Sequence, residues 1–221
     1  MKPYYSDERA KIYHADCRDI LPSIDASEIV VLVTDPPYGI DHKTHGQVFR
    51  NASPIAGDQD LVSADFVNSW AEARRAPTVM FFSPYRPLVG FRNVLVWSKG
   101  EHVGIGGDRE TCWKRDFEMI GVTRNGPLRG KRESGVLFFP ALLPPPSGHF
   151  AEKPVALMAY LIGKIGGRGT VIDPFCGSGS TLVAASDLGR RSIGVELDER
   201  WCEVAARRLA NRTASLFPGA E

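Results

Sequence analysis

The feature that most limits what this chain can fold into is an apolar run, Ile29 to Val33, which gives way after Thr34 to Asp35-Pro36-Pro37-Tyr38. The run is rich in β-branched residues and has no polar interruption, which predicts a strand buried on both faces. Proline lacks the N–H that a sheet needs and restricts the backbone, so two prolines end the strand in one stiff shape. We therefore expect Asp35 and Tyr38 at the carboxyl end of a buried strand, where open α/β sheets bind ligands.

The groups held at this strand end suit a planar ring that carries an amine. The Asp35 carboxylate and the Pro36 carbonyl offer two acceptors at a fixed separation, as an exocyclic NH2 group requires. The Tyr38 ring offers a face on which a flat base can stack. A plain proline-stiffened turn with a half-buried Tyr38 is the alternative, and this segment alone does not decide between the two.

Length and composition predict one domain, residues 1–221. A chain of 221 residues can bury one sizeable core, and 43% hydrophobic with 24% charged residues is ordinary for a soluble globular protein. No apolar run approaches the roughly 18 residues of a membrane span. The first seven residues contain no signal-peptide core, so the expected location is the cytoplasm.

The cysteines do not form a metal-binding or disulfide pattern. They are scattered, with no Cys-x-x-Cys pair and no histidines at zinc spacing, at Cys17, Cys112, Cys176 and Cys202. We expect reduced thiols without a ligand, and no metal site.

Further strands and helices follow from hydrophobic periodicity. Helices are expected at Asp65–Arg75, from Lys153-Pro154 onward, at Leu182–Leu188 and after Asp198. Strands are expected at Lys11–His14, Thr78–Phe82, Asn93–Trp97, Phe117–Thr123, Gly135–Phe139, Thr170–Ile172 and Ser192–Val195. The order predicts an α/β fold with a single doubly wound, mostly parallel sheet of Rossmann type and helices on both faces.

A second candidate site lies near the C-terminus, in the turn Asp173 to Thr181. Gly177 and Gly179 let a backbone approach a ligand, and Glu196, 19 residues beyond Gly177, stands where an acid can hold a ribose diol. The sequence fingerprint of dinucleotide-binding sites has a third glycine at the position that Leu182 occupies in this chain. The pattern therefore favours a nucleoside ligand without phosphates over NAD.

Four motifs together resemble those of S-adenosylmethionine-dependent DNA amino-methyltransferases. They are Asp35-Pro36-Pro37-Tyr38, the turn Asp173 to Gly179, the acid Glu196, and His149-Phe150-Ala151-Glu152-Lys153-Pro154, whose Phe150 departs from the usual His-Pro start. Catalytic motif first and cofactor motif last is the permuted order of the family's β group. The resemblance spans about Ile12 to Leu209. It implies that both strand ends meet at one site.

The resemblance implies roles for individual residues. The catalytic set is Asp35, Pro36, Pro37 and Tyr38, which hold the target amine and stack on a base flipped out of double-stranded DNA. Glu196 is expected on the ribose of S-adenosylmethionine and Asp16 on its adenine, although Asp16 also suits a helix N-cap. The cofactor-binding set is Asp16, Cys17, Asp35, Lys153, Pro154, Asp173, Phe175, Gly177, Gly179, Ser180, Thr181, Glu196 and Leu197.

The same resemblance favours adenine N6 as the target. An aspartate at position 35 is typical of adenine enzymes, whereas cytosine-N4 enzymes more often carry serine there. The sequence offers no Pro-Cys near the site, which argues against methylation at a ring carbon. The alternatives are a cytosine-N4 enzyme, a methyltransferase for an amine in RNA or for an amine or side-chain amide of a protein, an inactive cofactor-binding module and an NAD-dependent oxidoreductase.

Contacts with DNA are expected from basic loops. Residues 86 to 132 hold ten lysines and arginines against five acids, although the whole chain has a net charge of +1. Solvated loops are the plain alternative to a phosphate-binding face. The candidate loops and recognition region are residues 41–60, 98–116 and 124–149, with DNA contacts at His42, Lys43, Arg50, Lys99, Arg109, Arg124, Arg129, Lys131 and Arg132. The recognition sequence, a restriction partner and self-association stay open.

Overall fold

The computed structural model describes residues 1–37, 62–83, 90–101, 103, 113–114, 116–123, 131–165 and 169–216. Its described strands form one mixed sheet, made of β1 (Tyr5–Ser6), β2 (Ala10–His14), β3 (Val30–Thr34), β4 (Thr78–Phe82), β5 (Asn93–Ser98), β6 (Phe117–Val122), β7 (Val136–Phe138), β8 (Thr170–Asp173) and β9 (Ser192–Glu196). The helices are α1 (Cys17–Ile20), followed by a 3-10 turn at Leu21–Ser23, then α2 (Val62–Ala73), α3 (Val155–Ile165), α4 (Ser180–Asp187) and α5 (Glu199–Leu216).

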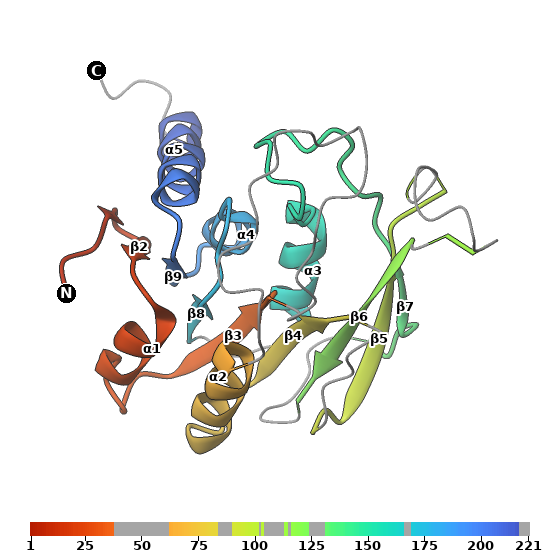
Figure 1. Cartoon of the computed structure of the whole chain (residues 1–221), viewed down its shortest axis with the longest axis horizontal. Coiled ribbons are helices and arrows are strands. Elements are labelled where there is room, and N and C mark those ends of the chain that lie inside the picture. Colours follow the sequence, from red (N-terminus) through yellow and green to blue (C-terminus); the bar gives the residue numbers. More distant parts are fainter. Residues whose placement is uncertain are drawn as a thin grey trace.

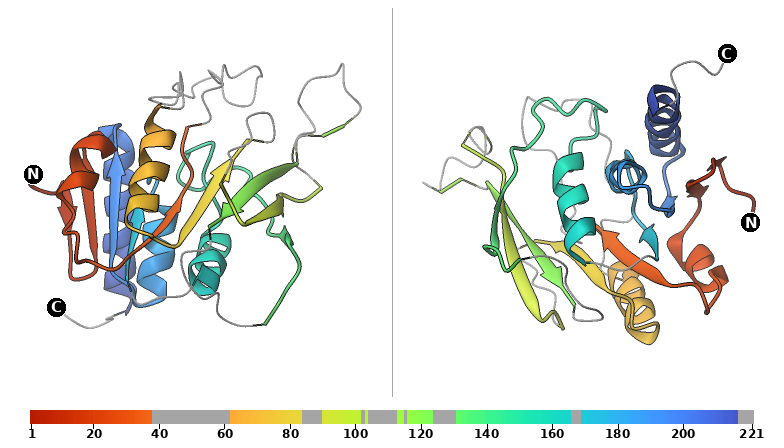
Figure 2. Two further views of the ribbon diagram at one scale, coloured as in Figure 1. Left: turned by 90° about the horizontal axis from the view of Figure 1, so that it is seen from below. Right: turned by 180° about the vertical axis from the view of Figure 1, so that it is seen from behind.

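The strands run in the order β1-β2-β9-β8-β3-β4-β6-β5-β7. Five neighbours at the centre, β2, β9, β8, β3 and β4, are parallel. β6 is antiparallel to both β4 and β5, and β1 is antiparallel to β2. The helices lie on both faces, α1 and α2 on one and α3, α4 and α5 on the other (Figure 1). Figure 2 shows the sheet and the helices on its two faces from below and from behind. The predicted α/β class and mostly parallel sheet are confirmed.

Strand β3 shows why helices must pack on both faces of this sheet. All five of its residues are buried. Val31 and Val33 pack in the core under α3 and α4, whereas Val30 and Leu32 pack in the core under α1 and α2. Because successive side chains point to opposite faces, a strand that is buried on both faces needs helices on each side of the sheet. No helix in the described parts of the chain is both long and apolar enough to span a membrane.

The two strand ends that carry the predicted motifs are neighbours. β3 pairs directly with β8, with Leu32 opposite Ile172. The Thr34 hydroxyl then donates a hydrogen bond of 2.7 Å to the Asp173 carboxylate across a sequence separation of 139 residues. The end of the apolar run and the start of the glycine turn therefore form one structure, as the predicted single site requires.

Candidate active site

Four acidic residues lie at one edge of the sheet. Asp16 follows β2, Glu196 ends β9, Asp173 ends β8, and Asp35 follows β3. These four strands are adjacent and parallel, so their carboxyl ends share an edge. The sheet thus presents a row of carboxylates where α/β proteins bind ligands. Such a row suits the hydroxyl and amine donors of a nucleoside.

The Asp35 carboxylate forms an ion pair with the ammonium of Lys153. The Lys153 Nζ also lies 3.2 Å from a carboxylate oxygen of Glu118, and the other oxygen of Glu118 lies 2.6 Å from the Nζ of Lys99. Lys153 is buried, just before α3. From the sequence, Lys153 was expected beside the cofactor. The structure directs its charge to the predicted catalytic acid.

The structure describes the two prolines after Asp35 but not the tyrosine that follows them. Pro36 is buried and Pro37 is half-buried, directly after Asp35. Tyr38 lies outside the described residues, so its predicted stacking role stays a prediction. Six of the predicted DNA contacts also lie outside them, namely His42, Lys43, Arg50, Arg109, Arg124 and Arg129.

The described DNA candidates lie in two different places. Lys99 follows β5 and pairs with Glu118 close to Lys153. Lys131 and Arg132 have exposed side chains just before β7. The Lys131 carbonyl accepts a hydrogen bond from Lys164 in the last turn of α3. This end of α3 lies at the side of the sheet opposite to Asp35. A phosphate contact by Lys131 or Arg132 would therefore be remote from the predicted catalytic acid.

The glycine turn is shaped by left-handed backbone at Gly177 (φ 47°) and Gly179 (φ 84°). A Cβ on Gly179 would lie 2.8 Å from the Cβ of Ala205 in α5, closer than real side chains pack. A Cβ on Gly177 would face the ring of His149 at 3.3 Å. From the sequence, both glycines were expected to let the backbone approach a ligand. In the structure Gly179 also lets the turn pack against α5.

Glu196 and the turn form one hydrogen-bonded unit. One oxygen of its carboxylate accepts from the Gly177 N–H and the other from the Asp198 N–H, each at 2.9 Å. Burial raises the pKa of Glu196, although these backbone donors and the Leu197 N–H oppose the shift. A carboxylate can accept about four hydrogen bonds, so Glu196 keeps capacity for a ribose hydroxyl. Leu197 itself is exposed.

Asp16 takes the role of helix cap that its sequence position also allowed. Its side chain accepts the Arg18 N–H at 2.8 Å at the start of α1, and it forms an ion pair with the Arg18 guanidinium at 2.5 Å. This hydrogen bonding with Arg18 lowers the pKa of Asp16. Cys17 is buried behind it, and burial raises the pKa of its thiol to about 12. The three described cysteines, Cys17, Cys176 and Cys202, are free and buried.

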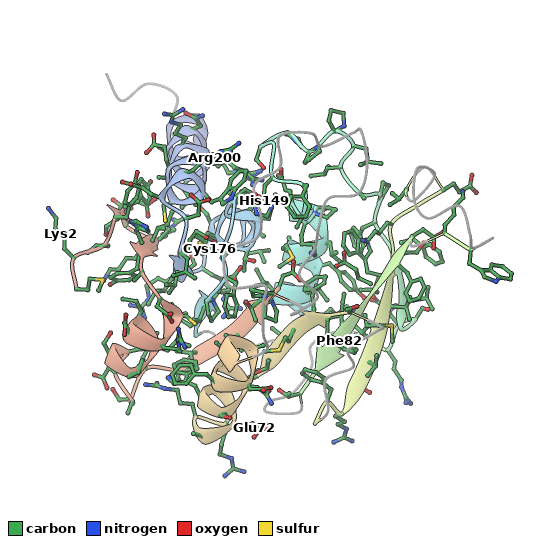
Figure 3. All side chains as sticks on the ribbon, viewed as in Figure 1. Lys2, Glu72, Phe82, His149, Cys176 and Arg200 are labelled. Atoms are coloured by element: carbon green, nitrogen blue, oxygen red, sulfur yellow. The ribbon has the colours of Figure 1, made fainter. Side chains whose placement is uncertain are left out.

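The segment before α3 packs against the turn. The ring of His149 lies edge-on to Trp201 at 4.4 Å and close to Gly177, and Figure 3 shows it near Arg200. Burial lowers the pKa of His149 to about 4, and the cation of Lys153 adds to the shift. Its Nδ1 is buried with no hydrogen-bond partner among the described residues. His149 therefore sits neutral beside the turn.

Arg208 of α5 ties this segment to the turn. It forms a 2.8 Å ion pair with Glu152, whose side chain is 1% exposed. Its other guanidinium nitrogen donates to the Ser178 carbonyl at 2.7 Å and reaches the hydroxyls of Ser178 and Ser180. Ser147 donates twice to the remaining Glu152 oxygen. Ser180, predicted to bind the cofactor, is thus buried and bonded within the protein.

No role was predicted from the sequence for Glu118, Glu152 or Arg208. Glu118 shares a strand face with Ile120 and Val122, and an acid in such an inward position is a usable signal. Arg208 lies between the buried residues of α5, but nothing in its spacing indicates a partner in the segment before α3. Only the folded chain brings those two together.

Asp173 gives a pH-dependent prediction. Burial raises its pKa to about 6, although Thr181, Thr34 and the Phe175 N–H bond to it. The native state thus keeps a proton that the unfolded chain releases near its ordinary value of 3.8. The retained proton stabilises the folded state fully below about pH 4, and this stabilisation is lost as the pH rises through 6. The free energy of unfolding should fall by about 3 kcal/mol over this range.

We therefore expect Asp173→Asn to remove this pH dependence. The amide oxygen can accept from Thr34 and Phe175, as the carboxylate does. Urea unfolding of both proteins between pH 4.5 and 8 measures the difference in unfolding free energy. As the pH rises, the unfolding free energy of the variant should increase relative to that of the wild-type protein. The other titrating groups, such as His149, contribute equally to both curves, so two parallel pH curves would contradict the prediction.

A protein-family model and a curated relative both connect this chain with methyltransferases. Residues 91–207 match the sequence model of an N6/N4 methyltransferase family described as DNA methylase. The type II methyltransferase M.ScaI of Streptomyces caespitosus is 25% identical over 265 residues, which cover 98% of this chain and 86% of that protein.

Solved structures share the fold. The M1.HpyAVI–SAM complex has a TM-score of 0.65 at 20% identity and covers 90% of this chain and 99% of that chain. The cytosine-N4-specific PvuII DNA methyltransferase has a TM-score of 0.69 at 16% identity and covers 94% of this chain and 88% of that chain. At these identities the likeness concerns the fold.

Proposed function

This chain belongs to the N6/N4 DNA methylase family, whose members use S-adenosylmethionine, and from that premise we propose that it methylates the N6 amine of adenine. Its substrate is DNA, as the family requires. The observation that carries the proposal is the position of Asp35. The hydrogen bond from Thr34 to Asp173 holds the Asp35 strand end against the glycine turn, so a target amine and the cofactor can meet.

Asp35 and the Pro36 carbonyl are proposed to hold the target amine. An aromatic amine is a poor nucleophile, because its lone pair is delocalised into the ring. Acceptors fixed at the nitrogen stabilise the N–H groups as they become acidic during the reaction, and they orient the lone pair. We place Tyr38 on the ring of the flipped base, as the resemblance implies. An aspartate rather than a serine at position 35 is what favours adenine.

The residues at the neighbouring strand ends fit the cofactor. Glu196 has acceptor capacity for a ribose hydroxyl, and Gly177 and Phe175 lie in the turn beside it. Asp16 and Cys17 begin α1 next to β9, at the place proposed for the adenine ring. When bound, S-adenosylmethionine would supply a methyl group on a cationic sulfur. On transfer, the sulfur would keep the electron pair of the broken S–C bond, and the amine nitrogen would gain the methyl group and lose a proton.

The test is the identity of the methylated base. Unmethylated DNA is incubated with the protein and S-adenosylmethionine, digested to nucleosides and analysed by mass spectrometry. We expect N6-methyladenine, at a defined sequence that modified-base sequencing then reveals. N4-methylcytosine as the product would overturn the adenine assignment and favour a cytosine-N4 specificity like that of the PvuII enzyme. Methylation of RNA but not DNA would overturn the proposal altogether.

A further inference from the structure

Lys153 is a buried cation placed between two carboxylates. Its Nζ forms an ion pair with Asp35 and lies 3.2 Å from Glu118. Its side chain is 8% exposed, and the rings of Phe81 and Trp97 lie 5.2 and 5.9 Å from Nζ. A buried ammonium is costly unless it is compensated, and here two anions and two aromatic faces compensate it. The lysine is therefore fixed in place.

Glu118 and Lys99 hold Lys153 from the side away from Asp35. β6 runs antiparallel to β4, so its first residues reach the edge where Asp35 lies. Burial would raise the pKa of Glu118, but the cations of Lys153 and Lys99 outweigh burial and lower the pKa to about 2. Glu118 is thus ionised at every working pH. Asp35, Lys153, Glu118 and Lys99 form a chain of alternating charge.

We propose that Lys153 is a positioning residue, anchored by Glu118 and Lys99, that holds the Asp35 carboxylate ionised and oriented toward the target amine. This role rests on the proposed function of Asp35. It differs from the cofactor contact that the sequence predicted for Lys153. Glu118 and Lys99 act on Asp35 only through Lys153.

Asp35 needs a cation beside it because a second carboxylate, that of Asp173, lies close by. Asp173 ends the adjacent strand, and the charge of Asp35 contributes to its raised pKa. Two carboxylates side by side compete for a proton, because like charges disfavour ionisation. The charged groups that the described residues place around this pair are Lys153 and, behind it, Glu118 and Lys99. Without Lys153, Asp35 would hold a proton more readily and accept hydrogen bonds less well.

The test separates kcat from KM. We expect Lys153→Met to lower kcat for DNA methylation by roughly 100-fold, the loss that a small misplacement of a reacting group causes, with KM for S-adenosylmethionine unchanged. The acid limb of the kcat profile should move up by about one pH unit or more, since the opposite charge has gone. A raised KM with unchanged kcat would instead identify Lys153 as a cofactor contact and overturn the proposal.

A second variant distinguishes positioning from stability. Lys153→Met leaves two partly buried anions without their shared cation, whereas Lys153→Met with Glu118→Gln leaves one and should recover much of the lost thermal stability. A positioning role predicts that kcat stays low in the double variant although its melting temperature has recovered. A purely structural role predicts that kcat recovers with the melting temperature, which would overturn the proposal.

The matched control is Lys164→Met. Lys164 pairs with Glu133 at 2.6 Å, far from Asp35 and at the protein surface, so kcat should equal that of the wild-type protein. Wild-type protein that binds S-adenosylmethionine but transfers no methyl group to DNA would contradict the proposed function. Active wild-type protein with an equally active Lys153→Met variant would contradict the role of Lys153 alone.

Discussion

Replacing Asp35 with asparagine is expected to lower kcat for methyl transfer by roughly 10²–10³-fold, the loss seen when one preorganised polar contact to a reacting group is removed. Asparagine keeps the size of the side chain but loses the negative charge, and it presents a donor where the amine needs an acceptor. Affinity for S-adenosylmethionine should change little, because Glu196 and the glycine turn are untouched. Single-turnover transfer and calorimetry measure the two quantities separately.

The matched control for Asp35→Asn is Asp187→Asn. Asp187 forms an ion pair with Arg212 at the surface, between α4 and α5, and both side chains are partly exposed. The same chemical change there should leave kcat and cofactor affinity at wild-type values. A melting curve for Asp35→Asn shows whether the variant is folded, since Lys153 loses one of its two anions. A folded variant with near wild-type kcat would remove Asp35 from the proposed mechanism.

Much of the fold could be predicted because it depends on local patterns. The run at β3 predicted a buried strand, and the alternation of strand, turn and helix after residue 170 predicted β8, α4 and β9. The permuted motif order implied that β3 and β8 meet, and the structure pairs them. The individual strands and helices follow from side-chain periodicity and from proline and glycine, which act within a few residues, whereas the meeting of β3 and β8 was implied by the resemblance to the methyltransferase family.

The charged partners could not be predicted, because they depend on how distant segments meet. β6 enters between β4 and β5 in the antiparallel sense, and only that insertion brings Glu118 to the edge where Asp35 and Lys153 lie. The role of Gly179 was likewise incomplete. A left-handed glycine in a turn is readable from sequence, but the close packing of Ala205 against it depends on where α5 lies.

Replacing Arg208 with methionine is expected to lower the free energy of unfolding by roughly 3–5 kcal/mol, because it leaves the buried carboxylate of Glu152 without its cation. The guanidinium also bonds to Ser178 and Ser180 in the turn, so those contacts are lost too. In a protein of this size the melting temperature should fall by about 10 °C. Urea unfolding and thermal melting measure the effect, and weaker binding of S-adenosylmethionine should accompany it.

The adjacent residue supplies the control for Arg208→Met. Arg207 pairs with Glu203 on the exposed face of α5, where the two side chains are 74% and 44% exposed, so Arg207→Met should melt at the same temperature as the wild-type protein. Adding Glu152→Gln to Arg208→Met removes the uncompensated charge and should restore part of the lost stability. If Arg208→Met and Arg207→Met melt together, the buried pair does not hold the segment before α3 against the glycine turn. In that case the position of Lys153, which directly follows Glu152, must depend on its contacts with Asp35 and Glu118 alone.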